Sequence, residues 1–241
     1  AYFEDILKLY DSNNSYHFRH LFNFLIFFSS SIVFFYFIKE RFQNNWAPII
    51  STLFFVTSPR IFAESFYNCK DIIFMSFVIF ALFFSLRSLR YYRINDLIIF
   101  AFFSAIATNV RIMGIFLIFL FIVFFFMESL ERKNFLKEKF HCILLLLFFY
   151  IFFTYLLWPY LWFDPIENFL YAFQSFKNYA WGGSILYFGD YVRGSNLPWH
   201  YIFSWIGITT PIIYLPLFLI GAIIIFKKFF KNFLKINNSN S

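Results

Sequence analysis

Long apolar runs, separated by short charged or polar segments, make up most of this sequence of 241 residues. An apolar run of about 20 residues crosses a bilayer as a helix, because a helix satisfies all its backbone hydrogen bonds internally. A soluble core could not bury 45 phenylalanines in a chain that is 61% hydrophobic. The sequence therefore predicts an all-α, polytopic transmembrane helix bundle of about seven spans. We place the spans at residues 21–38, 46–57, 72–86, 97–110, 112–127, 142–158 and 201–226.

Two segments outside the spans are predicted to be interfacial helices. Residues 2–10, and a stretch that begins at residue 165, both place apolar side chains on one helical face. The second stretch belongs to the longest polar segment, residues 159–200, which we expect to form one long outer loop. The last span is expected to be kinked by Pro211 and Pro216.

The number of crossings depends on residues 97–127, where two apolar runs are separated only by Arg111. Together they are long enough for two short spans joined by a tight turn. The alternative is one long tilted helix that buries Arg111 in the bilayer, and the sequence leaves both open. In a turn, Arg111 is either an ordinary hairpin residue or a group that binds an anionic head group at the outer leaflet.

The basic residues indicate how the chain is oriented in the membrane. Lys and Arg gather at residues 39–41, 87–93, 132–139 and 227–235, and loops rich in these residues stay in the cytoplasm. This pattern predicts a multi-pass protein of the cytoplasmic (inner) membrane with a cytoplasmic C-terminus. It also places the 159–200 loop on the outer side. Because topology explains the net charge of +7, we expect no nucleic acid partner.

Residues 58–71, SPRIFAESFYNCKD, form a charged insert between two apolar runs. Ionisable groups are costly at a membrane edge, so this insert is the first place to look for function. Ser58 followed by Pro59 is a typical helix start, with a capping hydroxyl and then proline at the first helical position. We predict a helix that begins at Pro59 and continues into the span at 72–86.

On such a helix three charged side chains of the insert share one stripe, because successive residues are about 100° apart. They are Arg60, Glu64 and Asp71, with Tyr67 close by and Lys70 pointing elsewhere. One interpretation is purely local, with an ion pair between Arg60 and Glu64 and a helix-capping role for Asp71. The other is a site facing a polar cavity, where a carboxylate is the base and cations hold a phosphate.

Aromatic side chains border the 159–200 loop on both sides. Most such residues belong to the aromatic belts of membrane interfaces, but some stack on sugars. The candidates for sugar or acceptor contact, besides Tyr67, are Trp158, Tyr160, Trp162, Trp199 and His200. The pair His17 and His20 is too weak a signal to predict a metal site.

The insert carries a resemblance to a known family. SPRIFAESFYNCKDIIF is similar to the pattern Ser-Pro-Arg-Ile-Phe…Phe-x-Asn-x-Lys-Asp of bacterial glycosyltransferase family 39-like proteins. These are relatives of the protein O-mannosyltransferases and of the aminoarabinose transferase of lipid A. The stretches YHFRHLFNFLIFF, ATNVRIMGI, LWPYLWFDPIENF and PWHYI…TTP resemble further blocks of the family, in the same order along nearly the whole chain.

This resemblance implies the C-type polytopic glycosyltransferase fold and a polyprenyl-phosphate sugar donor. It implies transfer on the extracytoplasmic side, with a main catalytic acid in the first outer loop and a second Asp matched by Asp71. It also implies that the first transmembrane helix and the start of that loop precede Ala1. The chain is thus expected to be one transmembrane domain, residues 1–241, truncated at its N-terminus and inactive alone. Glu4 and Asp5 would lie in the remaining end of the loop and are candidates for the catalytic set.

The residue types of the insert suit this chemistry. An acceptor hydroxyl must lose a proton as it attacks the anomeric carbon, which requires a carboxylate base. The departing lipid phosphate needs cations, for which Lys70, Arg60 and Arg111 are the candidates. We expect an inverting glycosyltransferase whose partners are the membrane lipid bilayer, a polyprenyl-phosphate sugar and a glycan, lipid or protein acceptor. We expect no cofactor, since the lipid-linked sugar is a substrate, and leave the metal requirement open. The alternatives are a transporter or flippase of lipid-linked sugars and a non-catalytic membrane scaffold.

Overall fold

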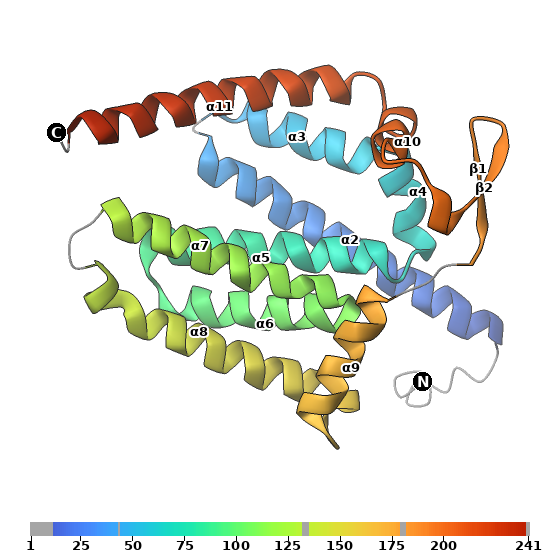
Figure 1. Cartoon of the computed structure of the whole chain (residues 1–241), viewed down its shortest axis with the longest axis horizontal. Coiled ribbons are helices and arrows are strands. Elements are labelled where there is room, and N and C mark those ends of the chain that lie inside the picture. Colours follow the sequence, from blue (N-terminus) through green and yellow to red (C-terminus); the bar gives the residue numbers. More distant parts are fainter. Residues whose placement is uncertain (1–11, 43, 132–134, 179–181, 240–241) are drawn as a thin grey trace. The chain divides into compact units, whose positions relative to one another are not determined.

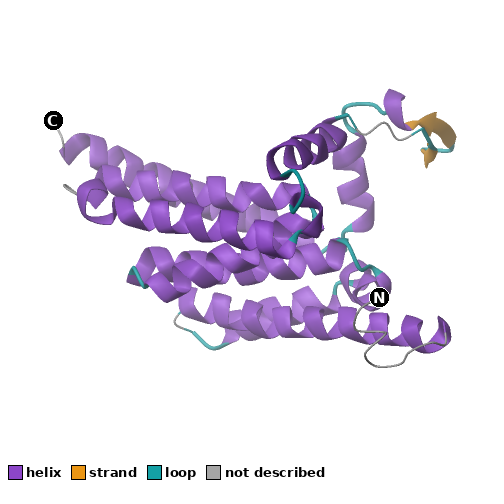
Figure 2. Ribbon diagram, turned by 90° about the horizontal axis from the view of Figure 1, so that it is seen from below, coloured by secondary structure: helices purple, strands orange, loops and turns teal. Residues whose placement is uncertain are grey.

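The computed structural model describes residues 12–42, 44–131, 135–178 and 182–239, which form two units, Ala1–Tyr179 and Ala180–Ser241. The first unit is helical, and its long helices run side by side in Figures 1 and 2. Its elements are α2 (Ser12–Arg41), α3 (Trp46–Thr57), α4 (Pro59–Tyr67), α5 (Asp71–Tyr91), α6 (Ile94–Val110), the 3₁₀ turn η1 (Ile112–Gly114), α7 (Ile115–Glu131), α8 (Phe135–Leu157), the 3₁₀ turn η2 (Pro159–Leu161) and α9 (Pro165–Lys177).

The second unit starts with a β-hairpin and ends with two helices. Its elements are β1 (Ser184–Tyr187), β2 (Asp190–Arg193), the 3₁₀ turn η3 (Gly194–Asn196), α10 (Tyr201–Thr209) and α11 (Tyr214–Ser239). The antiparallel strands are joined by Phe188 and Gly189, whose φ angles of 50° and 97° match the tight turn that suits the twist of a hairpin. Tyr187 secures the hairpin to α10, because its buried hydroxyl donates to Ser204 Oγ at 3.0 Å.

Four of the described helices, α2, α5, α7 and α8, are long and apolar enough to cross a membrane. The count reaches six if two bent pairs are each one span: α3 with α4, bent by 63°, and α10 with α11, bent by 116°. These elements and the shorter apolar helix α6, of 17 residues, correspond to the seven expected spans. The last of them is not merely kinked as expected. The helix stops after Thr209 and restarts at Tyr214, with Pro211 in the break.

The apolar helix α6 lies at the centre of the first unit, where it packs on both α5 and α8. Small side chains allow this close approach: Ala101, Ser104 and Ala105 are fully buried on α6, and Ser76 and Ala81 are fully buried on α5. Without a hydrophobic force between helices in lipid, such close van der Waals contact is what holds a membrane bundle together.

A hydrogen bond inside this core joins α6 to α8. The hydroxyls of Thr108 and Tyr150 are 2.9 Å apart, and Thr108 also donates to the backbone carbonyl of Ser104 at 2.8 Å. Thr108 is fully buried and Tyr150 nearly so. A polar contact of this kind fixes the rotation of one helix against the other.

Tyr150→Phe is expected to lower the free energy of unfolding by about 0.5–1.5 kcal/mol, because Thr108 loses its partner on α8. Unfolding in detergent micelles, followed by circular dichroism, measures the change. Tyr155→Phe is the matched control, since the Tyr155 side chain is 44% exposed on the same helix. An equal loss of stability in both variants would contradict the interhelical role of the hydroxyl.

The structure resolves the question of residues 97–127 in favour of two helices. After Val110 the chain turns through Arg111 and η1, and α7 runs back along the bundle (Figure 1). The turn is tight at Gly114, where an added Cβ would lie 2.7 Å from both Ala107 C and Thr108 Cα and closer still to Thr108 N. Only glycine allows the backbone of η1 to approach the last turn of α6 this closely.

Candidate active site

The charged insert is held in place by α2. Its helix α4 begins at Pro59 as expected, although the Ser58 hydroxyl makes no capping hydrogen bond. The buried amide of Asn23 on α2 donates to the carbonyl of Ser65 at 2.8 Å. The rings of Phe24 and Phe66 stack with centroids 5.1 Å apart. These two contacts fix the rotation of α4 about its axis. The charged residues of α4 lie on the face that is turned away from α2.

The expected continuous helix from Pro59 into the span at 72–86 is wrong. Helix α4 ends at Tyr67 and α5 begins at Asp71, with Asn68 between them in a non-helical conformation (φ −82°, ψ 88°). The side-chain Oδ1 of Asn68 accepts from the backbone N–H groups of Asp71 at 2.8 Å and Lys70 at 3.2 Å. An asparagine that bonds to nearby backbone in this way competes with the helix and starts a new one. The single-stripe argument for the charged residues therefore does not hold.

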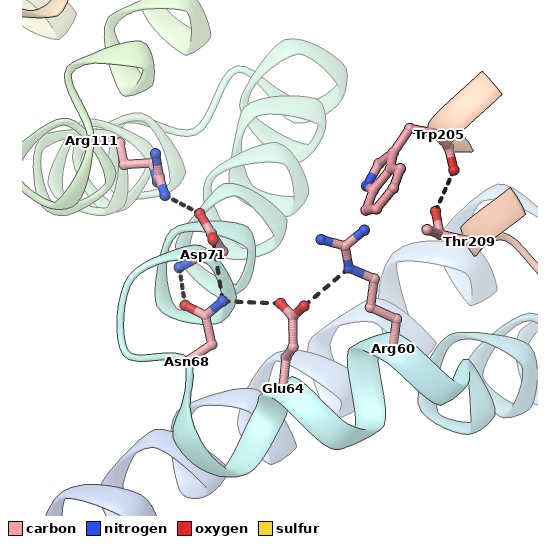
Figure 3. A network of polar contacts seen from close by, with 7 residues as sticks. All are labelled: Arg60, Glu64, Asn68, Asp71, Arg111, Trp205 and Thr209. Carbon is pink, nitrogen blue, oxygen red and sulfur yellow. Dashed lines mark hydrogen bonds and ion pairs between the residues drawn. The ribbon is translucent and has the colours of Figure 1, made fainter. Parts of the chain in front are cut away.

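The charged residues nevertheless meet, in a chain of polar contacts shown in Figure 3. Arg60 Nε donates to Glu64 Oε1 at 3.0 Å, one helical turn further along α4. The amide Nδ2 of Asn68 donates both to Glu64 Oε2 at 3.0 Å and to Asp71 Oδ2 at 3.2 Å. At the far end, Arg111 Nη2 donates to Asp71 Oδ1. Cations thus lie at both ends, with two carboxylates and a shared amide between them.

The pair at the end of this chain is accessible. The side chains of Asp71 and Arg111 are 56% and 43% exposed, whereas that of Glu64 is only 20% exposed. An exposed ion pair contributes roughly 0.2–1 kcal/mol, so an incoming phosphate can compete for the arginine. Lys70 is exposed as well, and its ammonium has no ion-pair partner in the part of the chain that the structure describes. Of the three cations predicted to bind phosphate, two are already paired with carboxylates.

These residues gather at one end of the bundle. Asp71 begins α5 and Arg111 ends α6, while the opposite end of α5 carries Arg87, about 24 Å away at 1.5 Å per residue. There Arg87 lies 3.5 Å from both Glu40 Oε1 and Asp96 Oδ2. These charged side chains therefore form two separate groups, one at each end of α5.

Other predicted residues of the first unit lie around the same end. Tyr67, at the last position of α4, is 59% exposed. Trp158, Tyr160 and Trp162 lie on and around η2, which follows α8, and α9 contacts the η1 turn next to Arg111.

Two of these aromatic residues have local contacts of their own. The indole N–H of Trp162 donates to the carbonyl of Tyr155 at 2.8 Å, which ties the chain back to α8. The rings of Trp158 and Tyr160 are 6.4 Å apart, and Tyr160 is 45% exposed.

The remaining candidates fall elsewhere. Trp199 belongs to the second unit and is 84% exposed. The rings of Trp199 and His200 meet edge to face, with their centroids 5.5 Å apart. Glu4 and Asp5 lie outside the described residues. Among the residues that are described, no three His, Cys, Asp or Glu side chains gather as a metal site would require.

Sequence reasoning did not single out Asn68, the residue that links the two carboxylates. The signal available was its position three residues before Asp71, which is the spacing of a side chain that caps the first turn of a helix. This signal was missed because one continuous helix was predicted across residues 59–86.

One of the three comparisons with known proteins gave a match. The profile of the family described as dolichyl-phosphate-mannose-protein mannosyltransferase matches residues 12–158. The match covers more than half of the chain and contains α2 to α8, with both Asp71 and Arg111. The comparisons with curated proteins and with solved structures returned no match.

Proposed function

This chain belongs to the dolichyl-phosphate-mannose-protein mannosyltransferase family, and we propose that it transfers a sugar from a polyprenyl-phosphate carrier to an acceptor hydroxyl. Membership makes it a multi-pass membrane glycosyltransferase of the mannosyltransferase kind. The observation that carries the finer proposal is the exposed Asp71 carboxylate, which lies at one membrane edge beside Arg111 and Lys70.

In the proposed reaction Asp71 is the general base among the described residues, and it acts beside the acid that the family resemblance implies in the first outer loop. Asp71 accepts the proton of the acceptor hydroxyl while the hydroxyl oxygen forms a bond to the anomeric carbon. The bond between that carbon and the phosphate oxygen breaks, and polyprenyl phosphate leaves with the electron pair. Attack opposite the leaving group inverts the anomeric configuration. A phosphate needs cations rather than a proton as it departs, so the step requires no carboxylic acid to protonate the leaving group.

The three cations of the site are proposed to bind the donor phosphate in different ways. Lys70 has no carboxylate partner among the described residues, and it is the first group that we expect to meet the donor phosphate. Arg111 can then exchange Asp71 for the phosphate, which leaves the carboxylate ready to accept a proton. Arg60 stays with Glu64, or joins the phosphate if the donor reaches α4.

A groove beside α4 supports a lipid-linked donor. It has a volume of about 510 Å³ and a mostly apolar lining. Phe62, on the helix that carries Arg60, contributes to its wall. The remaining lining residues come from α2 and α3: Phe24, Phe27, Phe28, Ser31, Ile32, Phe35, Tyr36, Thr52 and Val56. An isoprenoid chain lying there would have its phosphate end near the charged residues of the insert.

The charge distribution supports an extracytoplasmic site. The end of the bundle opposite Asp71 carries Arg41, Arg87 and Arg90, and loops rich in arginine stay in the cytoplasm. With that end inside, Asp71 faces the outer side of the cytoplasmic membrane. By the same reasoning the C-terminal segment with Lys227 and Lys228 is cytoplasmic.

Transfer can be measured with the full-length protein in lipid nanodiscs. We expect it to convert polyprenyl-phosphate mannose to free polyprenyl phosphate and a mannosylated acceptor of opposite anomeric configuration. A panel of glycan, lipid and peptide acceptors identifies the acceptor class, and a nucleotide-linked mannose is the donor control. Turnover of the nucleotide sugar alone, or movement of the lipid-linked sugar across vesicles without release of phosphate, would refute the proposal.

A further inference from the structure

Asn68 uses its whole side chain at the centre of the polar chain. Its amide Nδ2 donates to Glu64 Oε2 at 3.0 Å and to Asp71 Oδ2 at 3.2 Å. Its Oδ1 accepts the backbone N–H groups of Asp71 and Lys70, at 2.8 and 3.2 Å. A primary amide has two N–H donors, and here each has a carboxylate to bond (Figure 3).

This arrangement places a neutral donor between two negative charges. Carboxylates that approach one another destabilise each other's charged form unless a donor lies between them. Each of the two has an arginine on its other side, Arg60 for Glu64 and Arg111 for Asp71. Asp71 is therefore held at both oxygens, Oδ1 by Arg111 and Oδ2 by Asn68.

The two contacts of Asp71 differ in what happens to them when a donor binds. A phosphate competes for Arg111, because a guanidinium binds phosphate as readily as it binds carboxylate. A neutral amide has no such attraction to phosphate, so the bond from Asn68 remains. Once Arg111 has turned to the donor, Asn68 is the contact that determines where the free oxygen of Asp71 points.

We propose that Asn68 is a positioning residue for sugar transfer, which holds the carboxylates of Asp71 and Glu64 in one orientation through its amide. This inference rests on the proposed function, in which Asp71 is the base. Asn68 itself touches neither the acceptor nor the donor in this scheme. It acts through Asp71, because a general base must be aligned with the hydroxyl proton that it removes.

A simpler role would be helix capping alone, and two substitutions separate the roles. Serine and aspartate cap helices about as well as asparagine, so Asn68→Ser and Asn68→Asp both keep an acceptor for the N–H of Asp71. Neither can donate to both carboxylates. If Asn68 only caps α5, Asn68→Ser keeps the melting temperature and the turnover of the wild type.

For a positioning role we expect Asn68→Ser to lower kcat by about tenfold or more, with the donor KM unchanged. Asn68→Asp adds a third carboxylate to a site that already contains Glu64 and Asp71, with Arg60, Lys70 and Arg111 as its cations. A further negative charge makes a carboxylate harder to deprotonate, so the acidic limb of the kcat/KM profile should move to higher pH. A capping role alone leaves the kcat of Asn68→Ser at the wild-type value, whereas the pH profile of Asn68→Asp tests whether residue 68 lies beside the carboxylate that reacts.

Asn44→Asp is the matched control. The Oδ1 of Asn44 accepts the backbone N–H of Ala47 at 2.8 Å, so this asparagine caps the first turn of α3 without a carboxylate partner among the described contacts. We expect wild-type kcat and an unchanged pH profile for this variant. Wild-type kcat in Asn68→Ser would overturn the proposal, and so would an unchanged pH dependence in Asn68→Asp.

The melting temperature, which is measured without substrate, tests this inference independently of the proposed function. In Asn68→Asp the new charge repels Asp71 and Glu64, so its melting temperature should fall below that of the wild type at neutral pH and recover at acidic pH. If the wild type transfers no sugar from any lipid-phosphate donor, the proposed function fails. The melting curves then still test whether residue 68 lies between the carboxylates of Glu64 and Asp71. Equal curves for wild type and Asn68→Asp at both pH values would refute that contact.

Discussion

Asp71→Asn is expected to lower kcat for transfer from a polyprenyl-phosphate donor by about 10²–10⁴-fold, since an amide cannot accept the proton of the acceptor hydroxyl. The substitution keeps the shape of the side chain and the start of α5. The measurement is release of polyprenyl phosphate by the full-length protein in nanodiscs. Membrane insertion should stay normal, because Asp71 is exposed and its ion pair with Arg111 contributes little to stability.

The donor KM makes this prediction more specific. With asparagine at position 71, Arg111 no longer has a carboxylate partner there, and it becomes free to bind the donor phosphate. We therefore expect the donor KM to stay constant or fall while kcat collapses. Asp190→Asn, which changes an exposed carboxylate in the β2 strand, should leave both constants unaltered. Wild-type turnover in Asp71→Asn would remove Asp71 from the mechanism.

Gly114→Ala is expected to lower the free energy of unfolding by about 3 kcal/mol and to impair transfer as well. The new methyl group would overlap backbone atoms of Ala107 and Thr108, which cannot move aside as a flexible side chain can. The chain would have to open the turn between α6 and α7. Arg111 lies in that turn, so its contact with Asp71 would open with it.

The control for this substitution is Gly207→Ala on α10, where the added Cβ meets no described atom within 4 Å. Alanine favours a helix over glycine by up to about 1 kcal/mol, so this variant should be as stable as the wild type or slightly more so. Unfolding in micelles compares the two variants under the same conditions. Equal stability of Gly114→Ala and wild type would show that η1 does not press against α6.

The sequence was sufficient for the class of fold because a bilayer leaves a long apolar segment few choices. Runs such as 21–38 and 72–86 must be helical to satisfy their backbone groups, and both lie within helices of the structure. The residues of the insert could also be singled out, since charged groups at a membrane edge are costly. The i,i+4 pair of Arg60 and Glu64 follows from helical spacing alone and is present.

The sequence could not predict where these helices break or turn. Helical periodicity predicted a helix that continues past Tyr67. In the structure α4 ends there, because the Asn68 side chain accepts a hydrogen bond from the backbone N–H of Asp71 at the start of the next helix. Likewise Arg111 was compatible with one long helix or two. The choice depends on whether the backbone at Gly114 can lie against Thr108, which is a contact between residues that no local pattern describes.

The sequence by itself determined a helical membrane protein with an ionisable insert at one edge, because hydropathy and charge act through the bilayer and need no knowledge of packing. The tertiary structure alone decided that Arg111 meets Asp71, 40 residues earlier in the chain, and the break between α4 and α5 decided that Asn68 links Asp71 to Glu64. The physical reason is that short polar contacts require particular atoms at particular distances. Those distances are set by the packing of α4, α5 and α6 and by the tight turn at Gly114.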